Sequence, residues 1–143
     1  LHLLFNEFSK LQVIHGNNGQ LLTKLALNSL GGKIQKAKEE DKTVYLLFTG
    51  SDWCPPCISL KQKVFQNQRW KDAGDKMLTH IADFPITKKL SNEEKLENTR
   101  LAKSYNVTGY PTQLVLNGDG EVIRRSEGFT GSTNGYINWA LGE

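Results

Sequence analysis

Two cysteines in one tetrapeptide are the residues of this sequence best suited to carry chemistry. Cys54 and Cys57 are the only cysteines of the chain, and a spacing of three on a helix places both side chains on one face, one turn apart. Their Cα atoms are then expected about 5–6 Å apart, which a disulfide can bridge. At a helix N-terminus, the partial positive charge and the free N–H groups favour a thiolate on Cys54. We therefore predict that Cys54 attacks disulfides and that Cys57, expected to be the more shielded thiol, resolves the mixed disulfide.

Two other uses of the cysteine pair have to be weighed. A structural zinc site needs about four ligands, but there is no second cysteine pair, and His2, His15 and His80 show no ligand spacing. An inert disulfide across one turn stabilises little, because the loop that it closes is short. Redox chemistry is the favoured interpretation. It requires no organic cofactor and no metal, because the electrons move through a redox-active Cys54–Cys57 disulfide.

The residues around the motif predict a buried strand followed by a helix. Residues 43–49 are short, apolar and rich in β-formers, which is typical of a strand covered on both faces. After the motif, Cys57, Leu60 and Val64 form one helical stripe. The two prolines between the cysteines fit only the first turn of a helix. The cysteine pair is therefore expected at a helix N-terminus, directly after a buried strand.

The rest of the chain alternates predicted helices and strands. Further helices are expected over 33–40, from a capping box at Ser91 and Glu94 to about Tyr105, and from Ser132 or Thr133 through Leu141. Further strands are expected over 77–83, 112–116 and 121–125, the last two joined by a hairpin turn at 117–120. This order predicts an α/β domain with a mixed sheet over residues 29–143. Residues 1–28 form an N-terminal extension, expected to be either a hairpin or an arm.

Composition excludes several classes of protein. The chain has 143 residues, 38% apolar and 23% charged, as expected for one globular domain. A net charge of +3 is too small to indicate nucleic-acid binding. The apolar runs are far shorter than the roughly 20 residues of a membrane-spanning helix. Because the chain begins at Leu1, we expect a mature form or a fragment. Separately, we expect the protein to be a monomer.

The motifs together resemble those of the thioredoxin superfamily. The segment WCPPC at 53–57 follows the predicted strand, and VTGYPT at 107–112 is similar to the family's cis-proline loop. The segments TGSDWCPPC and ADFP look most like bacterial, often exported, thioredoxin-like proteins described as disulfide isomerases. They also resemble the reductase domain of membrane-bound thiol–disulfide interchange proteins. The resemblance implies a thioredoxin fold, three-layer α/β/α with a central mixed sheet. It also implies protein thiols and disulfides as substrates, and an electron donor or acceptor of unspecified identity.

The resemblance also assigns roles around the cysteines. It implies a cis peptide before Pro111, and it implies that the Tyr110 backbone pairs with an extended substrate segment. The implied substrate-binding residues are Trp53, Pro55, Pro56, Tyr110 and Pro111. The alternatives are a trans proline at a strand start for Pro111, core packing for Trp53, and a lid over the disulfide for Tyr110. Trp70 and Trp139 are assigned to core packing.

One position departs from the family pattern. Thioredoxins carry a buried Asp six residues before the first cysteine, where this chain has Phe48. That acid helps to take the proton from the resolving thiol, which Phe48 cannot do, and an apolar neighbour disfavours a thiolate. Asp52 and Asp83 are the candidate substitutes, although a solvated surface acid is the plainer interpretation of each.

The direction of electron flow follows from the residues between the cysteines. Two prolines remove both N–H donors there, which favours a reductase or isomerase over a strong oxidant. Two other functions stay open: a non-catalytic binding module on the same fold, and a maturation factor for one thiol client. The resemblance favours a periplasmic or extracellular location, with the cytoplasm as the alternative.

Overall fold

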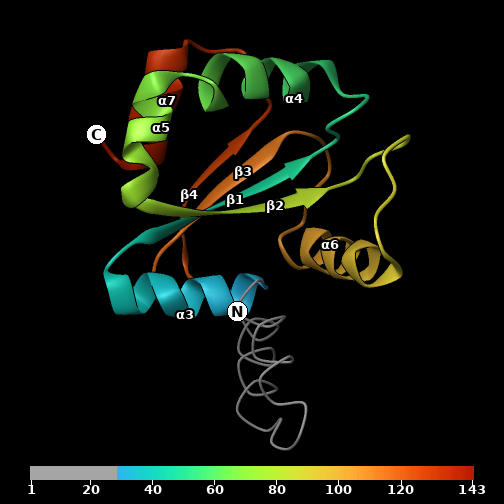
Figure 1. Ribbon diagram of the computed structural model, residues 1–143, viewed down its shortest axis with the longest axis horizontal. Coiled ribbons are helices and arrows are strands. Elements are labelled where there is room, and N and C mark those ends of the chain that lie inside the picture. The colour runs from blue at the N-terminus through green and yellow to red at the C-terminus, as the bar shows by residue number, and fades with distance from the viewer. Residues whose placement is uncertain (1–28) are drawn as a thin grey trace, which may run out of the picture.

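The computed structural model describes residues 29–143 as alternating helices and strands (Figure 1). The predicted N-terminal extension lies outside the described residues. The helices are α3 (Leu30–Glu40), α4 (Pro55–Leu60), α5 (Gln68–Asp72), α6 (Asn92–Ser104) and α7 (Thr133–Leu141). A π-helical turn (Lys61–Phe65) follows α4, and a 3-10 turn (Ala73–Asp75) follows α5. The strands are β1 (Thr43–Thr49), β2 (Met77–Asp83), β3 (Thr112–Leu116) and β4 (Val122–Glu127).

The four strands form one mixed sheet in the order β2-β1-β3-β4. Strand β1 pairs in parallel with β2 and antiparallel with β3, and β4 pairs antiparallel with β3. Helices α3 and α6 cover one face of the sheet, while α4, α5 and α7 cover the other (Figure 1). The prediction of a three-layer α/β/α thioredoxin fold with a mixed sheet is confirmed.

Strand β1 divides the interior into two cores, because alternate side chains of a strand point to opposite faces. Val44, Leu46 and Phe48 pack in the core under α3 and α6. Tyr45 and Leu47 pack in the core under α4 and α7. The central strand is therefore apolar on both faces, as residues 43–49 predicted. Trp70 and Trp139 pack against the second core, so their assignment to packing is confirmed.

The helix ends show where sequence patterns and structure differ. Helix α3 begins three residues before the predicted start, because Ser29 caps it by accepting a hydrogen bond from the Gly32 N–H. Helix α5, which was not predicted, begins at an Asn67 cap that accepts from the Arg69 N–H. The capping box at Ser91 is confirmed, and Ser132, not Thr133, caps α7. These differences leave the placement of the cysteine motif unchanged.

Candidate active site

The two cysteines form a disulfide at the start of α4. Cys54 is the N-cap residue, with extended backbone angles, and prolines fill the first two helical positions. The Cα atoms of Cys54 and Cys57 lie 5.2 Å apart, within the expected range. Because prolines lack N–H groups, the Cys57 N–H is the first in α4 that a charged Cys54 sulfur could use.

The cysteines do not differ in burial as the sequence predicted. Cys54 is 3% exposed and Cys57 is 4% exposed, so the expectation that Cys57 is the more shielded of the two is wrong for the disulfide form. The reason is that a loop from elsewhere in the chain covers Cys54. The Cys54 Sγ lies 3.6 Å from the Tyr110 carbonyl oxygen in that loop. On the other sulfur, the Gly50 N–H donates a hydrogen bond to Cys57 Sγ at 3.5 Å.

The loop that covers Cys54 contains the cis peptide. The Tyr110–Pro111 bond is cis, as the resemblance implied, and Pro111 is buried. Pairing of Thr112 with Phe48 across β3 and β1 brings this loop to the end of β1, where the cysteine motif begins. The Pro111 carbonyl accepts from the Gly128 N–H at 2.7 Å, which holds the loop to the end of β4.

Three aromatic rings pack on one another at the residue that precedes Cys54, and we call Trp53, Phe84 and Tyr110 the aromatic ledge. The Tyr110 ring stacks edge-on against Trp53 at a centroid distance of 5.8 Å and tilts against Phe84 at 5.2 Å. Trp53 Nε1 donates to the Phe84 carbonyl at 2.7 Å. Trp53 is 42% exposed, so the alternative that it packs in the core is wrong. Burial raises the pKa of the Tyr110 hydroxyl above its usual value, which keeps this ring neutral.

Gly50 is a site residue that the sequence reasoning missed, having treated it only as a breaker after the strand. A Cβ at this position would collide with the indole ring of Trp53. Glycine therefore lets the Trp53 ring lie directly against the backbone beside the motif, while the Gly50 N–H reaches Cys57. Its place between an apolar strand and the cysteines was the available signal.

The residues considered as proton acceptors for Cys57 are engaged elsewhere. Phe48, at the position of the family's buried Asp, has no acidic group and is fully buried in the core under α3 and α6. The Asp83 carboxylate accepts from the Ser51 N–H at 3.0 Å and from the Ser51 hydroxyl at 2.5 Å. Asp52 accepts four hydrogen bonds from residues 86–88, and these donors hold its pKa well below the usual range. The sequence left each acid as either a proton acceptor for Cys57 or a solvated surface acid. It did not predict that both carboxylates would accept hydrogen bonds from backbone N–H groups.

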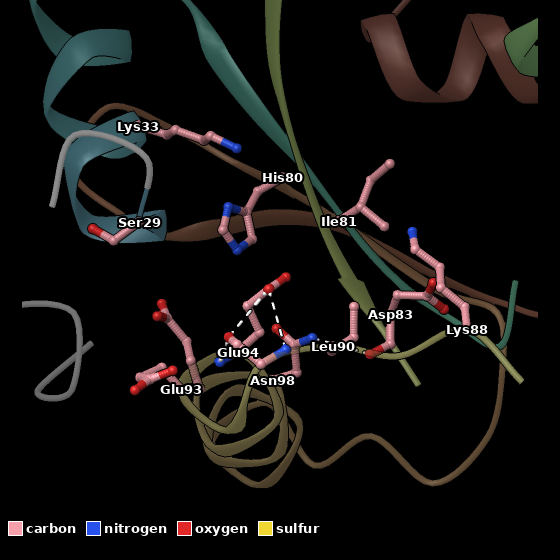
Figure 2. A pocket seen from close by; sticks show the side chains of 12 residues that line it. Ser29, Lys33, His80, Ile81, Asp83, Lys88, Leu90, Glu93, Glu94 and Asn98 are labelled. Atoms are coloured by element: carbon pink, nitrogen blue, oxygen red, sulfur yellow. Dashed lines mark hydrogen bonds between the residues drawn. The ribbon is translucent and has the colours of Figure 1, made fainter. Parts of the chain in front are cut away.

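A hollow of about 910 Å³ runs along the outer edge of β2, between α3 and the start of α6 (Figure 2). His80 points into it from β2, and Lys33 donates to the Thr79 carbonyl beside it at 3.0 Å. Burial, together with the Lys33 charge, lowers the pKa of His80 to about 4. Within residues 29–143, no group of three or more His, Cys, Asp or Glu side chains is arranged to hold a metal ion. The helices of this part of the chain are too short or too polar to cross a bilayer.

Comparisons with known proteins agree with this geometry. The sequence profile of the thioredoxin-like domain family matches residues 30–139. Disulfide bond reductase DsbH of Chlamydia pneumoniae is 29% identical over 115 residues, which cover 80% of this chain and 69% of DsbH. Bos taurus nucleoredoxin is also 29% identical, over 69% of this chain, but the chain spans only 26% of that protein.

Solved structures show the same similarity. A structure of DsbH oxidoreductase superposes with a TM-score of 0.71 at 29% identity, covering 80% of this chain and 82% of that one. The C-terminal domain of Neisseria meningitidis DsbD, in its oxidised form, superposes with a TM-score of 0.53 at 26% identity. That match covers 76% of this chain and 86% of the DsbD domain.

Proposed function

The chain belongs to the thioredoxin-like domain family and is a thiol–disulfide oxidoreductase, and we propose that it reduces protein disulfides with Cys54 as nucleophile and Cys57 as resolving thiol. The observation that carries this proposal is the Cys54–Cys57 disulfide at the start of α4, with Cys54 Sγ against the cis-proline loop. A substrate that reaches Cys54 must pass the Tyr110 backbone and the aromatic ledge.

The proposed reaction has two exchange steps. The Cys54 thiolate attacks one sulfur of the substrate disulfide, forms a mixed disulfide and releases the other sulfur as a thiolate, which takes a proton from water. Cys57 then loses its proton and attacks Cys54 Sγ, which releases the second substrate thiol and leaves the Cys54–Cys57 disulfide. The substrate gains two electrons and two protons. We propose no organic cofactor and no metal, because both electrons pass between sulfur atoms.

The environment of Cys54 supports the reductase direction. A dithiol is a strong oxidant in its disulfide form when its thiolate is well stabilised. Here the prolines provide no N–H to a Cys54 thiolate, and the Tyr110 carbonyl oxygen lies 3.6 Å from its sulfur. An oxygen with partial negative charge at that distance favours a neutral thiol over a thiolate. Phe48, which is buried in the core under α3 and α6, supplies no carboxylate at the position where the family pattern has a buried Asp. The name of DsbH as a reductase agrees with this direction.

For substrate binding we propose Trp53, Pro55, Pro56, Tyr110 and Pro111. In this scheme the Tyr110 backbone pairs with an extended substrate segment, by the same hydrogen bonds that add a strand to a sheet. An electron donor then returns the disulfide to the dithiol. A periplasmic or extracellular location, a monomeric state and the absence of nucleic-acid binding remain predictions from the sequence. Cell fractionation and sedimentation would test the first two.

Insulin reduction in the presence of dithiothreitol tests the proposed function. The wild-type chain should accelerate precipitation of the insulin B chain, and Cys54→Ser should abolish the acceleration because the attacking sulfur is lost. Equilibration with glutathione gives the direction. We expect a potential near that of thioredoxin, about −270 mV, and far from the −120 mV of a strong oxidant. No acceleration over the uncatalysed control would favour a binding module, and a potential near −120 mV would reverse the proposed direction.

A further inference from the structure

The side chain of Asp52 organises the segment that follows β2. Its Oδ1 accepts from the Ile86 N–H at 2.9 Å, and its Oδ2 accepts from the Thr87 N–H at 2.8 Å. Oδ2 also accepts from the Thr87 hydroxyl at 2.6 Å and from the Lys88 N–H at 2.9 Å. Successive backbone N–H groups that converge on one point form the concave arrangement by which loops bind anions. Here the anion comes from the same chain.

The two neighbours of Asp52 bind the same segment, residues 83–88, which we call the anchored segment. Ser51 donates two hydrogen bonds to the Asp83 carboxylate. Trp53 Nε1 donates to the Phe84 carbonyl. Three consecutive residues that lead into Cys54 are thus each bonded to the anchored segment. The conformation of that segment is therefore set from the cysteine motif itself.

The anchored segment carries an exposed apolar side chain whose backbone is bonded to a residue just before the disulfide. Ile86 is 74% exposed, and its backbone is fixed by Asp52, two residues before Cys54. Trp53, which is 42% exposed, follows Asp52 directly. Exposed apolar side chains that gather at one place mark contact surfaces. A surface that is already ordered binds its partner without a further loss of conformational entropy.

The charge of Asp52 fits this role. An unpaired carboxylate on Asp52 would place a strongly hydrated group beside two exposed apolar residues, its chain neighbour Trp53 and its bonded partner Ile86. Four donors compensate the charge instead, and they hold the pKa of the carboxyl well below its usual range. The carboxylate therefore keeps its hydrogen bonds throughout the neutral pH range.

We propose that Asp52 is a positioning residue for substrate docking. It fixes the anchored segment so that Ile86 and Trp53 form a preformed surface for an extended, apolar polypeptide segment that carries the substrate disulfide. This inference rests on the proposed function and deepens it. It adds a specificity surface contributed by residues that follow the cysteine motif by some 30 positions. Asp52 acts here through the loop and not on the sulfur atoms.

Three variants and one control separate this role from others. Asp52→Asn keeps the shape of the side chain but loses the charge and one acceptor oxygen. Thr87→Val removes only the hydroxyl donor, while Thr87→Ser retains it. Asp75→Asn is the matched control, because Asp75 is an exposed acid at the opposite end of β2. Each is assayed for KM and kcat with insulin, for the rate of its dithiol form with the small reagent dithiobis(nitrobenzoate), and for amide hydrogen exchange at residues 86–88.

The positioning role predicts a specific pattern. Asp52→Asn should raise KM for insulin about tenfold, as expected for losing a charged hydrogen-bond acceptor. Its kcat and its rate with the small reagent should stay within about twofold, and exchange at residues 86–88 should accelerate. Thr87→Val should raise KM about threefold, whereas Thr87→Ser and Asp75→Asn should match the wild type.

Other outcomes overturn the inference. An unchanged KM in Asp52→Asn refutes it, as does an equal loss of rate with insulin and with the small reagent, which would place Asp52 in the sulfur chemistry. If Asp52→Asn does not fold, equal KM values for Thr87→Val and Thr87→Ser refute it. The two proposals fail in distinguishable ways. A wild-type chain that does not reduce insulin overturns the proposed function, while unchanged exchange at residues 86–88 in Asp52→Asn overturns the anchoring.

Discussion

Reduction of the Cys54–Cys57 disulfide should destabilise the folded chain. Closing a loop of sequence separation 3 removes about 6 cal/mol/K of entropy from the unfolded chain, or about 2 kcal/mol at 25 °C. The folded state offers a Cys54 thiolate little in return, because the prolines at the first two positions of α4 provide no N–H and the Tyr110 carbonyl oxygen lies 3.6 Å from the sulfur. The disulfide form should therefore be about 2 kcal/mol more stable. By thermodynamic linkage, the potential should lie about 40 mV below that of the same pair in the unfolded chain.

Thermal unfolding of both redox forms measures this difference. For a domain of this size, about 2 kcal/mol corresponds to a rise in Tm of about 8 °C in the disulfide form. Circular dichroism is the suitable probe, because the fluorescence of Trp53 responds directly to the neighbouring disulfide. The double variant Cys54→Ser/Cys57→Ser should show no change of Tm with reductant. A reduced form that is equally or more stable would mean that the thiolate is strongly stabilised, which would refute both the reasoning and the reductase direction.

Three further predictions test the cysteine site, the hollow beside β2 and the core under α4 and α7. Cys57→Ser should accumulate mixed disulfides between Cys54 and disulfide-containing substrates on non-reducing gels, while Cys54→Ser should not; a Cys57→Ser variant that still turns over insulin would contradict the assignment. The pKa of His80 falls from 6.5 to about 4 on folding, so the unfolded chain takes up this proton first. The contribution of His80 to the free energy of unfolding is therefore complete above about pH 6.5, and about 3 kcal/mol of it is lost as the pH falls towards 4. Denaturant titrations at several pH values should show that His80→Gln lacks this part of the pH dependence. If the free energy of unfolding changes with pH equally in His80→Gln and in the wild type, the prediction is wrong. Tyr45→Phe removes the partner of the buried Tyr136 hydroxyl, which should cost about 1–3 kcal/mol, whereas the double variant with Tyr136→Phe should recover most of that loss. Equal costs for the single and double variants in urea unfolding would count against this coupling.

Local patterns predicted most of the secondary structure for identifiable reasons. The apolar run at 43–49 predicted a doubly covered strand, because a strand buried on both faces has no polar side. The prolines placed the cysteines at a helix start, because proline is compatible only with the first turn. Helix α5 and the early start of α3 were missed. The Asn67 cap starts α5 although the sequence of that helix gives only a weak helical signal. The Ser29 cap starts α3 although two glycines follow within its first turn.

The candidate site was predicted in part. Cys54 and Cys57 were identified because two thiols one turn apart have few other uses, and the cis bond before Pro111 followed from the resemblance. The roles of Asp52 and Gly50 were not identified. Their contacts join residues that are far apart in sequence or depend on the volume of a neighbouring ring, and neither property leaves a pattern in the local sequence.

The sequence alone determined which atoms can react and at which end of a helix they stand, since these depend on residues within one or two turns of each other. Tertiary structure decided how the two sulfurs differ. The pairing of β1 with β3 carries the Tyr110 carbonyl to Cys54 across 56 positions of the chain, and the hydrogen bonds of Asp52 span 34 to 36 positions. Contacts over such separations form only when the whole sheet has assembled, because the pairing of distant strands fixes the geometry that no single segment contains.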